Sequence, residues 1–369
     1  MNKLSSMRGA ALAAFTLTVV TFAAAAACAQ SLSDIKPPAE PLVLLSQGSF
    51  FVGGRTVDTE DAGWSNMEDL FGEPFEAGKV TVDQMYVQFQ VPEAPSHPPI
   101  VFMHGGLLTS KQWETTPDGR MGWYEYFTRQ GFPTYLAEQT GRGRSGFNGT
   151  IFNQVRRGKL SPDTQPNVYL GTSNMAWKVF RFGPELGKTN DGLQFPVNHV
   201  DEVYKQIIPD MIETQVPSLM AELVTPETNN PTVDNIAALA HDLGGAILVG
   251  HSQSAGFPTQ AVLKNKGGIR GLIQLETGCF QSLTDEQVAA LAEIPILVMV
   301  GDYLGPNPGA SCAEEMDKIK SAGGDITFIS LPELGIKGNS HMFMQEKNNL
   351  VIADLLVDWV NEHVDRENR

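Results

Sequence analysis

The sequence is poor in cysteine, in basic side chains and in charged residues generally. Its 369 residues include three cysteines and seven histidines, too few for a disulfide scaffold or a structural zinc module. Lys and Arg number 26 against 42 Asp and Glu, so the formal net charge is −16. We expect no nucleic-acid partner, because phosphate backbones are bound by clustered basic side chains. With 42% hydrophobic and 18% charged residues, the composition is that of a folded globular protein.

Only one long apolar run is present, and it lies at the start of the chain. Lys3 and Arg8 precede the uncharged stretch 10–27, and small residues occupy 27–29. A basic start, a short apolar core and a small-residue exit predict a secretory signal peptide over 1–29. A permanent membrane anchor is disfavoured, because the run is barely long enough and is rich in weakly hydrophobic alanine. We therefore expect a periplasmic or secreted protein with no membrane anchor in the mature chain.

Export bears on the cysteines and on the net charge. Cleavage removes Cys28. The alternative is a lipoprotein acylated on Cys28, but a leucine is usual three residues before such a cysteine, and this chain has Ala25 there. Cys279 and Cys312 remain, and an even pair in an oxidising compartment predicts one disulfide. Two buried free thiols are the alternative. Loss of two basic residues and no acidic residue changes the net charge from −16 to −18.

Apolar runs and helical patterns alternate along the rest of the chain. Strands are predicted over 41–57, 79–91, 99–103, 133–138, 246–250, 270–275, 295–300 and 325–331. Helices are predicted over 233–243, 256–265, 284–293, 311–321 and 350–364. This alternation predicts an α/β protein, with a mostly parallel doubly wound sheet and helices on both faces.

A long interval, 147–232, interrupts this alternation. It is rich in Asn, Gly and Pro, and one amphipathic helix is predicted over 200–213. Long connections in compact domains are usually functional loops or lids, so we expect a lid-like insertion within one domain that spans 30–369. The aromatic residues Trp177, Phe180 and Phe182 either line a substrate pocket there or only anchor the insertion to the domain.

The chemistry concentrates in the segment Gly-His-Ser-Gln-Ser at 250–254. An apolar strand enters this segment and a helix leaves it, which is the setting of a nucleophile elbow centred on Ser252. The turn requires small residues two positions before and after the serine. Gly250 meets the first requirement, and Ser254 stands where a second glycine is usual. The pattern predicts a nucleophilic serine at 252.

A serine nucleophile needs a base and an acid that orients the base. In this architecture both follow the serine, in the order acid and then histidine. His341 lies in a loop between the last strand and the last helix, whereas His363 ends an amphipathic helix, so His341 is the predicted base. Glu276 and Asp302 each end a strand, and the residues alone leave them nearly even as the acid.

Acyl transfer also needs donors for the developing oxyanion. One is predicted to be the backbone N–H of Gln253, directly after the nucleophile. The second is expected from the His-Gly-Gly-Leu loop at 104–107, with Gly106 as the first choice and Leu107 as the next.

A second glycine motif, Gly-x-Gly-x-x-Gly at 141–146, also follows a strand. It is not expected to bind a dinucleotide, because a turn-like stretch rather than a helix follows it. No cofactor and no metal are predicted. Its two arginines either contact an acidic substrate group or belong to a solvated loop, and the solvated loop is favoured.

Taken together, the 104–106 motif, the loop at 139–146, the Ser252 elbow and the late His341 resemble the α/β-hydrolase superfamily over 41–364. More narrowly, the elbow, the turn at 50–54 and the long insertion resemble the bacterial esterase 713-like family of exported serine esterases. That resemblance implies Glu276 as the triad acid and a small-molecule ester as the substrate. An amidase with the same triad and an exported solute-binding protein remain as alternatives.

Overall fold

A computed structural model gives the architecture of most of the chain. It describes residues 30–59, 78–165, 167–210, 231–277, 283–306, 308–310 and 312–365. The predicted signal peptide and Cys279 lie outside the described residues. Within the described ranges, no helix combines the length and the apolar character needed to cross a membrane.

The described strands form one eight-stranded sheet in the order β1-β2-β4-β3-β5-β6-β7-β8. Their bounds are β1 Leu44–Thr59, β2 Gly78–Pro92, β3 Ile100–Met103, β4 Thr134–Ala137, β5 Ala246–His251, β6 Ile269–Leu275, β7 Ile296–Val300 and β8 Ile326–Ser330. The strands β3 to β8 pair in parallel, and β1 and β2 pair antiparallel at one edge. All eight strands were predicted. The central strands are buried on both faces and are therefore continuous apolar runs, whereas the more exposed β1 and β2 are rich in β-branched and aromatic residues.

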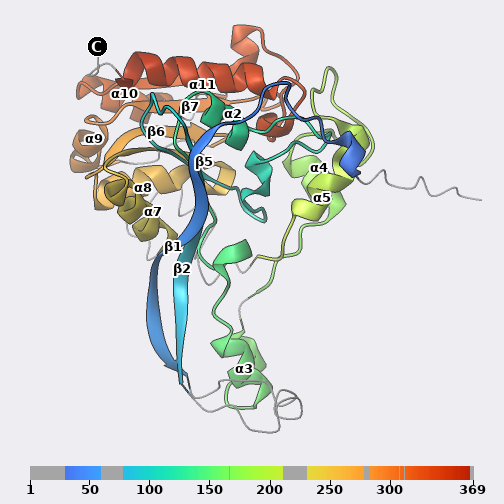
Figure 1. The fold of residues 1–369 in the computed structure, drawn as a ribbon, viewed down its shortest axis with the longest axis vertical. Coiled ribbons are helices and arrows are strands. Elements are labelled where there is room, and N and C mark those ends of the chain that lie inside the picture. The colour runs from blue at the N-terminus through green and yellow to red at the C-terminus, as the bar shows by residue number, and fades with distance from the viewer. Residues whose placement is uncertain are drawn as a thin grey trace, which may run out of the picture.

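Helices cover both faces of the sheet (Figure 1). One face packs against α7 Pro231–Asp242, α8 Phe257–Lys264, α9 Asp285–Leu291 and α10 Ala313–Ser321. The other packs against α2 Trp123–Arg129, α4 Ser173–Val179, α5 Val200–Gln206 and α11 Asn349–His363. Alternate residues of β5 supply the two cores: Leu248 packs in the first and Ile247 in the second. The predicted doubly wound architecture is confirmed.

Shorter elements connect these layers. The α-helix α3, Thr150–Arg156, has no buried residue. The 3-10 turns are η1 Leu32–Asp34, η2 Ser110–Trp113, η3 Gly143–Ser145, η4 Pro162–Thr164, η5 Val197–His199, η6 Ser252–Gly256, η7 Leu331–Leu334 and η8 Phe343–Gln345.

The predicted helices differ from the observed ones mainly in the insertion and in its surroundings. The helix predicted over 200–213 ends at Gln206, and Pro209 explains this because the residue before a proline is pushed into extended backbone. The helices α2, α3 and α4 were not predicted. For α2 the reason is its five aromatic and β-branched residues among seven, which have modest helix propensity.

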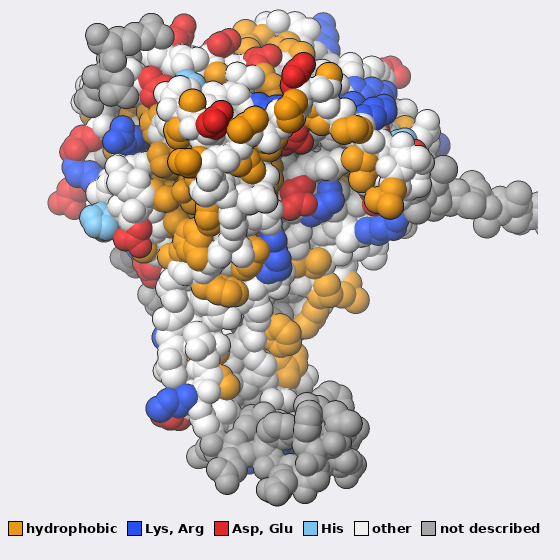
Figure 2. Space-filling view, viewed as in Figure 1, with side chains coloured by type: hydrophobic (Ala, Val, Ile, Leu, Met, Phe, Trp, Pro, Cys, Tyr) orange, Lys and Arg blue, Asp and Glu red, His pale blue; other side chains and the backbone are white. Residues whose placement is uncertain are grey.

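The β1–β2 hairpin extends well beyond the rest of the sheet (Figure 1). The strand β2 pairs with β4 only from Val87 to Gln90, so among the described residues no further strand lies beside the distal part of the hairpin. In the space-filling view the lower part of the molecule, which holds the distal hairpin and α3, is narrower than the body (Figure 2). Phe51 of β1 is 58% exposed.

The aromatic residues of the insertion are buried in the core beneath α2 and α11. Trp177 packs edge-on against Phe182, and Phe182 stacks on Phe195 with ring centroids 4.0 Å apart. For Trp177 and Phe182 the anchoring interpretation therefore holds. Phe180 differs, because its ring stacks on His341 with the planes 10° apart.

Candidate active site

The strand β5 runs directly into the sharp turn that carries Ser252. Ser252 has a φ of +55°, a left-handed conformation that is unusual for a residue with a side chain. A Cβ at Gly250 would meet the carbonyl oxygen of Ser254, so only glycine fits there. The Ser254 hydroxyl accepts the His251 N–H at 3.0 Å and lies 3.1 Å from the Met103 carbonyl, to which it donates. The serine that departs from the usual glycine therefore ties the elbow to β3.

His341 and Glu276 meet at the carboxyl end of the sheet. The Nδ1 atom of His341 lies 2.8 Å from Oε2 of Glu276. The other carboxylate oxygen of Glu276 accepts the Gly301 N–H at 2.6 Å, and the His341 N–H donates to the Phe180 carbonyl at 3.1 Å. Both side chains are buried. With Nδ1 engaged, Nε2 is the ring nitrogen of His341 that remains for proton transfer.

Asp302, the competing acid, lies elsewhere. Its carboxylate accepts the N–H groups of Tyr303 at 2.7 Å and Gly338 at 3.0 Å, and so fixes the start of the loop that leads to His341. The structure brings Glu276, rather than Asp302, to the ring of His341.

His251, next to Ser252, contacts the backbone of His341. Its Nε2 lies 2.9 Å from the His341 carbonyl oxygen, and the two rings have centroids 4.8 Å apart. Burial and the neighbouring His341 lower the pKa of His251 to about 3, so the ring is neutral and donates from Nε2. The contact places His341 beside the elbow. The role of His251 was not predicted from the sequence.

Arg181, a residue of the insertion, reaches the Glu276 carboxylate. Its Nη2 lies 2.5 Å from Oε2 of Glu276, and its Nε donates to the Asp302 carbonyl at 2.9 Å. Burial by itself would raise the pKa of Glu276, but Arg181, the bond to His341 and the Gly301 amide together lower it to about 2. No motif surrounds Arg181, so no signal in the sequence pointed to it.

The predicted oxyanion loop packs against the elbow. A Cβ at Gly105 would lie 3.3 Å from the Ser252 Cβ, and one at Gly106 would lie 3.4 Å from the Gln253 Cβ. Gln253 is the second residue of η6, where a backbone N–H has no partner within the helix. Leu107 donates its N–H to Asp210 at 3.1 Å. Of the two candidates in the loop, Gly106 is therefore the one whose N–H meets no acceptor among the described residues.

The glycine motif at 141–146 is an internal structural loop. Its arginines are paired with acids: Arg142 with Asp210 at 2.7 Å, and Arg144 with Glu138 at 2.8 Å. Arg142 is only 3% exposed, so the expectation of a solvated loop is wrong for this residue. The motif itself contains the 3-10 turn η3, and the next helix, α3, begins only at Thr150.

A buried acid, Glu346, holds the histidine loop from behind. Its two oxygens accept the Ser340 N–H at 2.6 Å and the Asn339 side-chain amide at 2.5 Å. Burial raises the pKa of Glu346 to about 7, against the hydrogen bonds that lower it.

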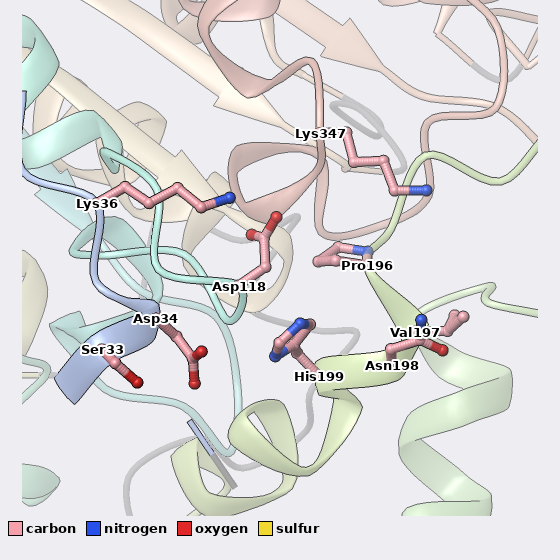
Figure 3. A pocket seen from close by; sticks show the side chains of 9 residues that line it. All are labelled: Ser33, Asp34, Lys36, Asp118, Pro196, Val197, Asn198, His199 and Lys347. Carbon is pink, nitrogen blue, oxygen red and sulfur yellow. The ribbon is translucent and has the colours of Figure 1, made fainter. Parts of the chain in front are cut away.

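A separate polar pocket of about 350 Å³ contains none of these residues (Figure 3). Basic and acidic side chains from distant segments line it, among them Lys36, Asp118, His199 and Lys347.

Comparison with known proteins found relatives that match most of the chain. No family model matches the sequence. A probable secreted lipase, phiG, of a fungal species (strain ATCC 74256) is 26% identical over 377 residues, covering 87% of this chain and 95% of the lipase. The structure of a protein described as a novel bacterial esterase is 41% identical, with a TM-score of 0.79, and the match covers 89% of this chain and 99% of the esterase.

The chain belongs to the α/β-hydrolase superfamily. The relationship is not confined to the fold, because 41% of the residues are identical across a match that covers 89% of the chain. The chain is accordingly an enzyme, a hydrolase of the carboxylesterase type.

Proposed function

We propose that the chain is an exported serine esterase that cleaves carboxylic esters through an acyl-enzyme on Ser252. In this proposal His341 is the general base and Glu276 orients it. The observation that carries the proposal is the 2.8 Å contact between His341 Nδ1 and Glu276, beside a serine held in a left-handed elbow. This combination matches the requirement of a nucleophile, a base and an orienting acid.

The reaction begins when Ser252 attacks the ester carbonyl and His341 accepts the hydroxyl proton at Nε2. The Glu276 carboxylate stabilises the imidazolium and keeps the proton on Nδ1. His341 then protonates the leaving alcohol, which departs and leaves the acyl group on Ser252. Water, deprotonated by His341, attacks the acyl carbonyl, and the acid product leaves as the proton returns to the serine.

The backbone N–H groups of Gln253 and Gly106 bind the oxyanion of each tetrahedral intermediate. Both belong to segments in contact with Ser252 or its neighbour. The N-terminal end of the η6–α8 segment adds to the stabilisation of the oxyanion, because its first N–H groups have no partner within the helix and carry partial positive charge.

The proposed substrate is a small-molecule ester. The names of the two relatives, a lipase and an esterase, support esters over amides. An amidase with the same residues is the second candidate, because amide hydrolysis uses an identical triad.

Export is proposed from the N-terminal pattern, and a relative described as secreted supports it. Cys312 is a disulfide-bonded residue at the start of α10, and we propose Cys279 as its partner. Cys279 lies three residues after Glu276 in the sequence, so this bond would brace the segment that carries the acid. It closes a loop of 33 residues, which by loop entropy stabilises the fold by about 3–4 kcal/mol.

A fluorophosphonate probe and a panel of substrates test the proposal. We expect one probe molecule per chain, attached to Ser252 and absent in Ser252→Ala. Chromogenic acyl esters of graded chain length, run beside aryl amides of the same acids, will show the acyl preference and the choice between ester and amide. Labelling that persists in Ser252→Ala would remove the basis of the proposal, and so would the absence of any labelling, which is the result expected of a solute-binding protein.

A further inference from the structure

We propose that the buried ion pair between Arg142 and Asp210 positions both donors of the oxyanion hole. The inference rests on the proposed function, because it assigns these side chains to the same reaction. Neither side chain is proposed to touch the substrate. They act through Leu107 and Gln253, so they are positioning residues.

The pair joins two segments far apart in the sequence. Arg142 comes from the glycine loop after β4, and Asp210 comes from the insertion. The Nε atom of Arg142 donates to Oδ1 of Asp210 at 2.8 Å, and Nη2 lies 2.7 Å from Oδ2. Each side chain is only 2% exposed, so solvent does not screen the pair.

Asp210 fixes the loop that carries Gly106. Its Oδ2 accepts the Leu107 N–H at 3.1 Å, and the Leu107 carbonyl accepts the Ile208 N–H at 2.9 Å. Leu107 has a φ of +60°, a conformation that a leucine keeps only when its surroundings impose it. Both polar groups of Leu107 are thus held by the insertion. The Leu107 N–H belongs to the same peptide group as the Gly106 carbonyl, so these contacts fix that peptide group and, through it, the orientation of Gly106.

Arg142 fixes the other donor. Its Nη1 donates to the Gln253 side-chain oxygen at 2.7 Å and also to Gln139. Gln139 in turn donates to the His104 carbonyl at 2.6 Å, at the start of the oxyanion loop. The side chain of Gln253 is therefore drawn toward Arg142, and its backbone N–H remains available beside Ser252.

Stability alone does not account for this arrangement. Removing two charges from water costs free energy that their attraction often fails to recover, and apolar replacements of similar volume are frequently as stable. Oxyanion stabilisation, by contrast, depends on donors that are already oriented before the reaction, and small displacements of such groups lower the rate. A fork-shaped guanidinium can bind a carboxylate through two nitrogens and an amide oxygen through a third N–H, a geometry that the single ammonium of lysine does not reproduce.

The main test is the double variant Arg142→Met/Asp210→Leu, which removes both charges and leaves no unpaired ion. We expect kcat to fall roughly tenfold to a thousandfold, the effect of a displaced or lost oxyanion donor, with KM within about twofold. The affinity for a trifluoromethyl ketone, whose adduct on Ser252 carries an oxyanion, should fall by the same factor as kcat/KM. A residue that acted only on folding would not move these two quantities together.

The matched control is Arg129→Met/Glu125→Leu, the same removal of both charges in a less buried pair on α2 with a 2.6 Å contact. We expect it to change kcat by less than about threefold, since the rate responds only to groups that touch the reacting atoms or position them. Arg142→Lys covers the case in which the main variant does not fold. It keeps the charge opposite Asp210 but loses the bond to Gln253, so kcat should fall about tenfold with little change in Tm.

A double variant, or an Arg142→Lys enzyme, with unchanged kcat and unchanged ketone affinity would overturn the inference. So would a rise in KM alone, because that indicates a role in substrate binding. These outcomes differ from failure of the proposed function, in which fluorophosphonate would not label Ser252 of the wild-type enzyme at all.

Discussion

The strand ends and the insertion contribute to the candidate site in different ways. The strand ends and their loops supply the residues proposed to react: Ser252 after β5, Glu276 after β6 and His341 after β8. The insertion supplies residues that hold these in place, Arg181 against Glu276 and Asp210 against the oxyanion loop. The sheet therefore brings the chemistry together, and the insertion sets its orientation and its charge. An insertion of this kind is part of the site and not only a cover over it.

The largest expected effect comes from the reactive side of this comparison. Ser252→Ala removes the nucleophile, and kcat should fall by about five orders of magnitude or more. Circular dichroism and Tm should stay close to those of the wild type, because the side chain is small and partly exposed. Steady-state kinetics on a chromogenic ester measures the loss. Residual activity above about one per cent would place the nucleophile elsewhere.

The two strand-end carboxylates give the next largest difference. Glu276→Gln should lower kcat by roughly a thousandfold to ten-thousandfold, because the amide does not hold the proton on His341 Nδ1. Asp302→Asn is the matched control. It alters only contacts to the Tyr303 and Gly338 amides, and we expect a loss below about tenfold. Equal losses in the two variants, or the reverse ranking, would exclude Glu276 as the acid.

On the insertion side, Arg181→Met should lower kcat about tenfold at neutral pH and more at acidic pH. Without the guanidinium, only His341 and the Gly301 amide counteract the rise in pKa that burial causes, so the pKa of Glu276 rises from about 2. The carboxylate then takes up a proton at a higher pH than in the wild type. The ratio of kcat at pH 5 to kcat at pH 8 measures this shift, and Arg181→Lys should restore most of it. An unchanged ratio in Arg181→Met would confine Arg181 to packing.

The smallest effect concerns stability and involves neither the nucleophile nor the insertion. Burial raises the pKa of Glu346 from 4.5 to about 7, so between these values the native chain keeps a proton that the unfolded chain has lost. Stability therefore falls as pH rises through this window. Glu276 has the opposite sign: its pKa of about 2 means that stability falls as pH decreases below 4.5. Thermal unfolding of wild type and Glu346→Gln from pH 4.5 to 7.5 checks the first effect, and parallel curves would contradict it.

Much of the framework was predictable from the sequence. Buried parallel strands are short apolar runs, and the elbow at Ser252 is a local pattern of small residues between a strand and a helix. The position of His341 follows from chain order, and the choice of Glu276 over Asp302 came from a family resemblance.

The supporting residues were not predictable, for a physical reason. Arg181 and Asp210 act on partners 95 and 103 residues away in the sequence, and their neighbours form no local pattern. Arg142 lies in a recognisable glycine motif, yet only the fold shows that its charge is buried against Asp210. Contacts between an insertion and a strand end depend on the path of the whole chain, which local propensity does not encode.

In the proposed mechanism Ser252 carries the acyl group during turnover. Mixing the enzyme with a p-nitrophenyl ester, quenching in acid within the first turnovers and mapping the peptides by mass spectrometry tests this directly. We expect a burst of one nitrophenol per active chain and an acyl mass increment on the peptide at Ser252, both absent in Ser252→Ala. An increment on another residue, or turnover with no acylated peptide at any quench time, would contradict it.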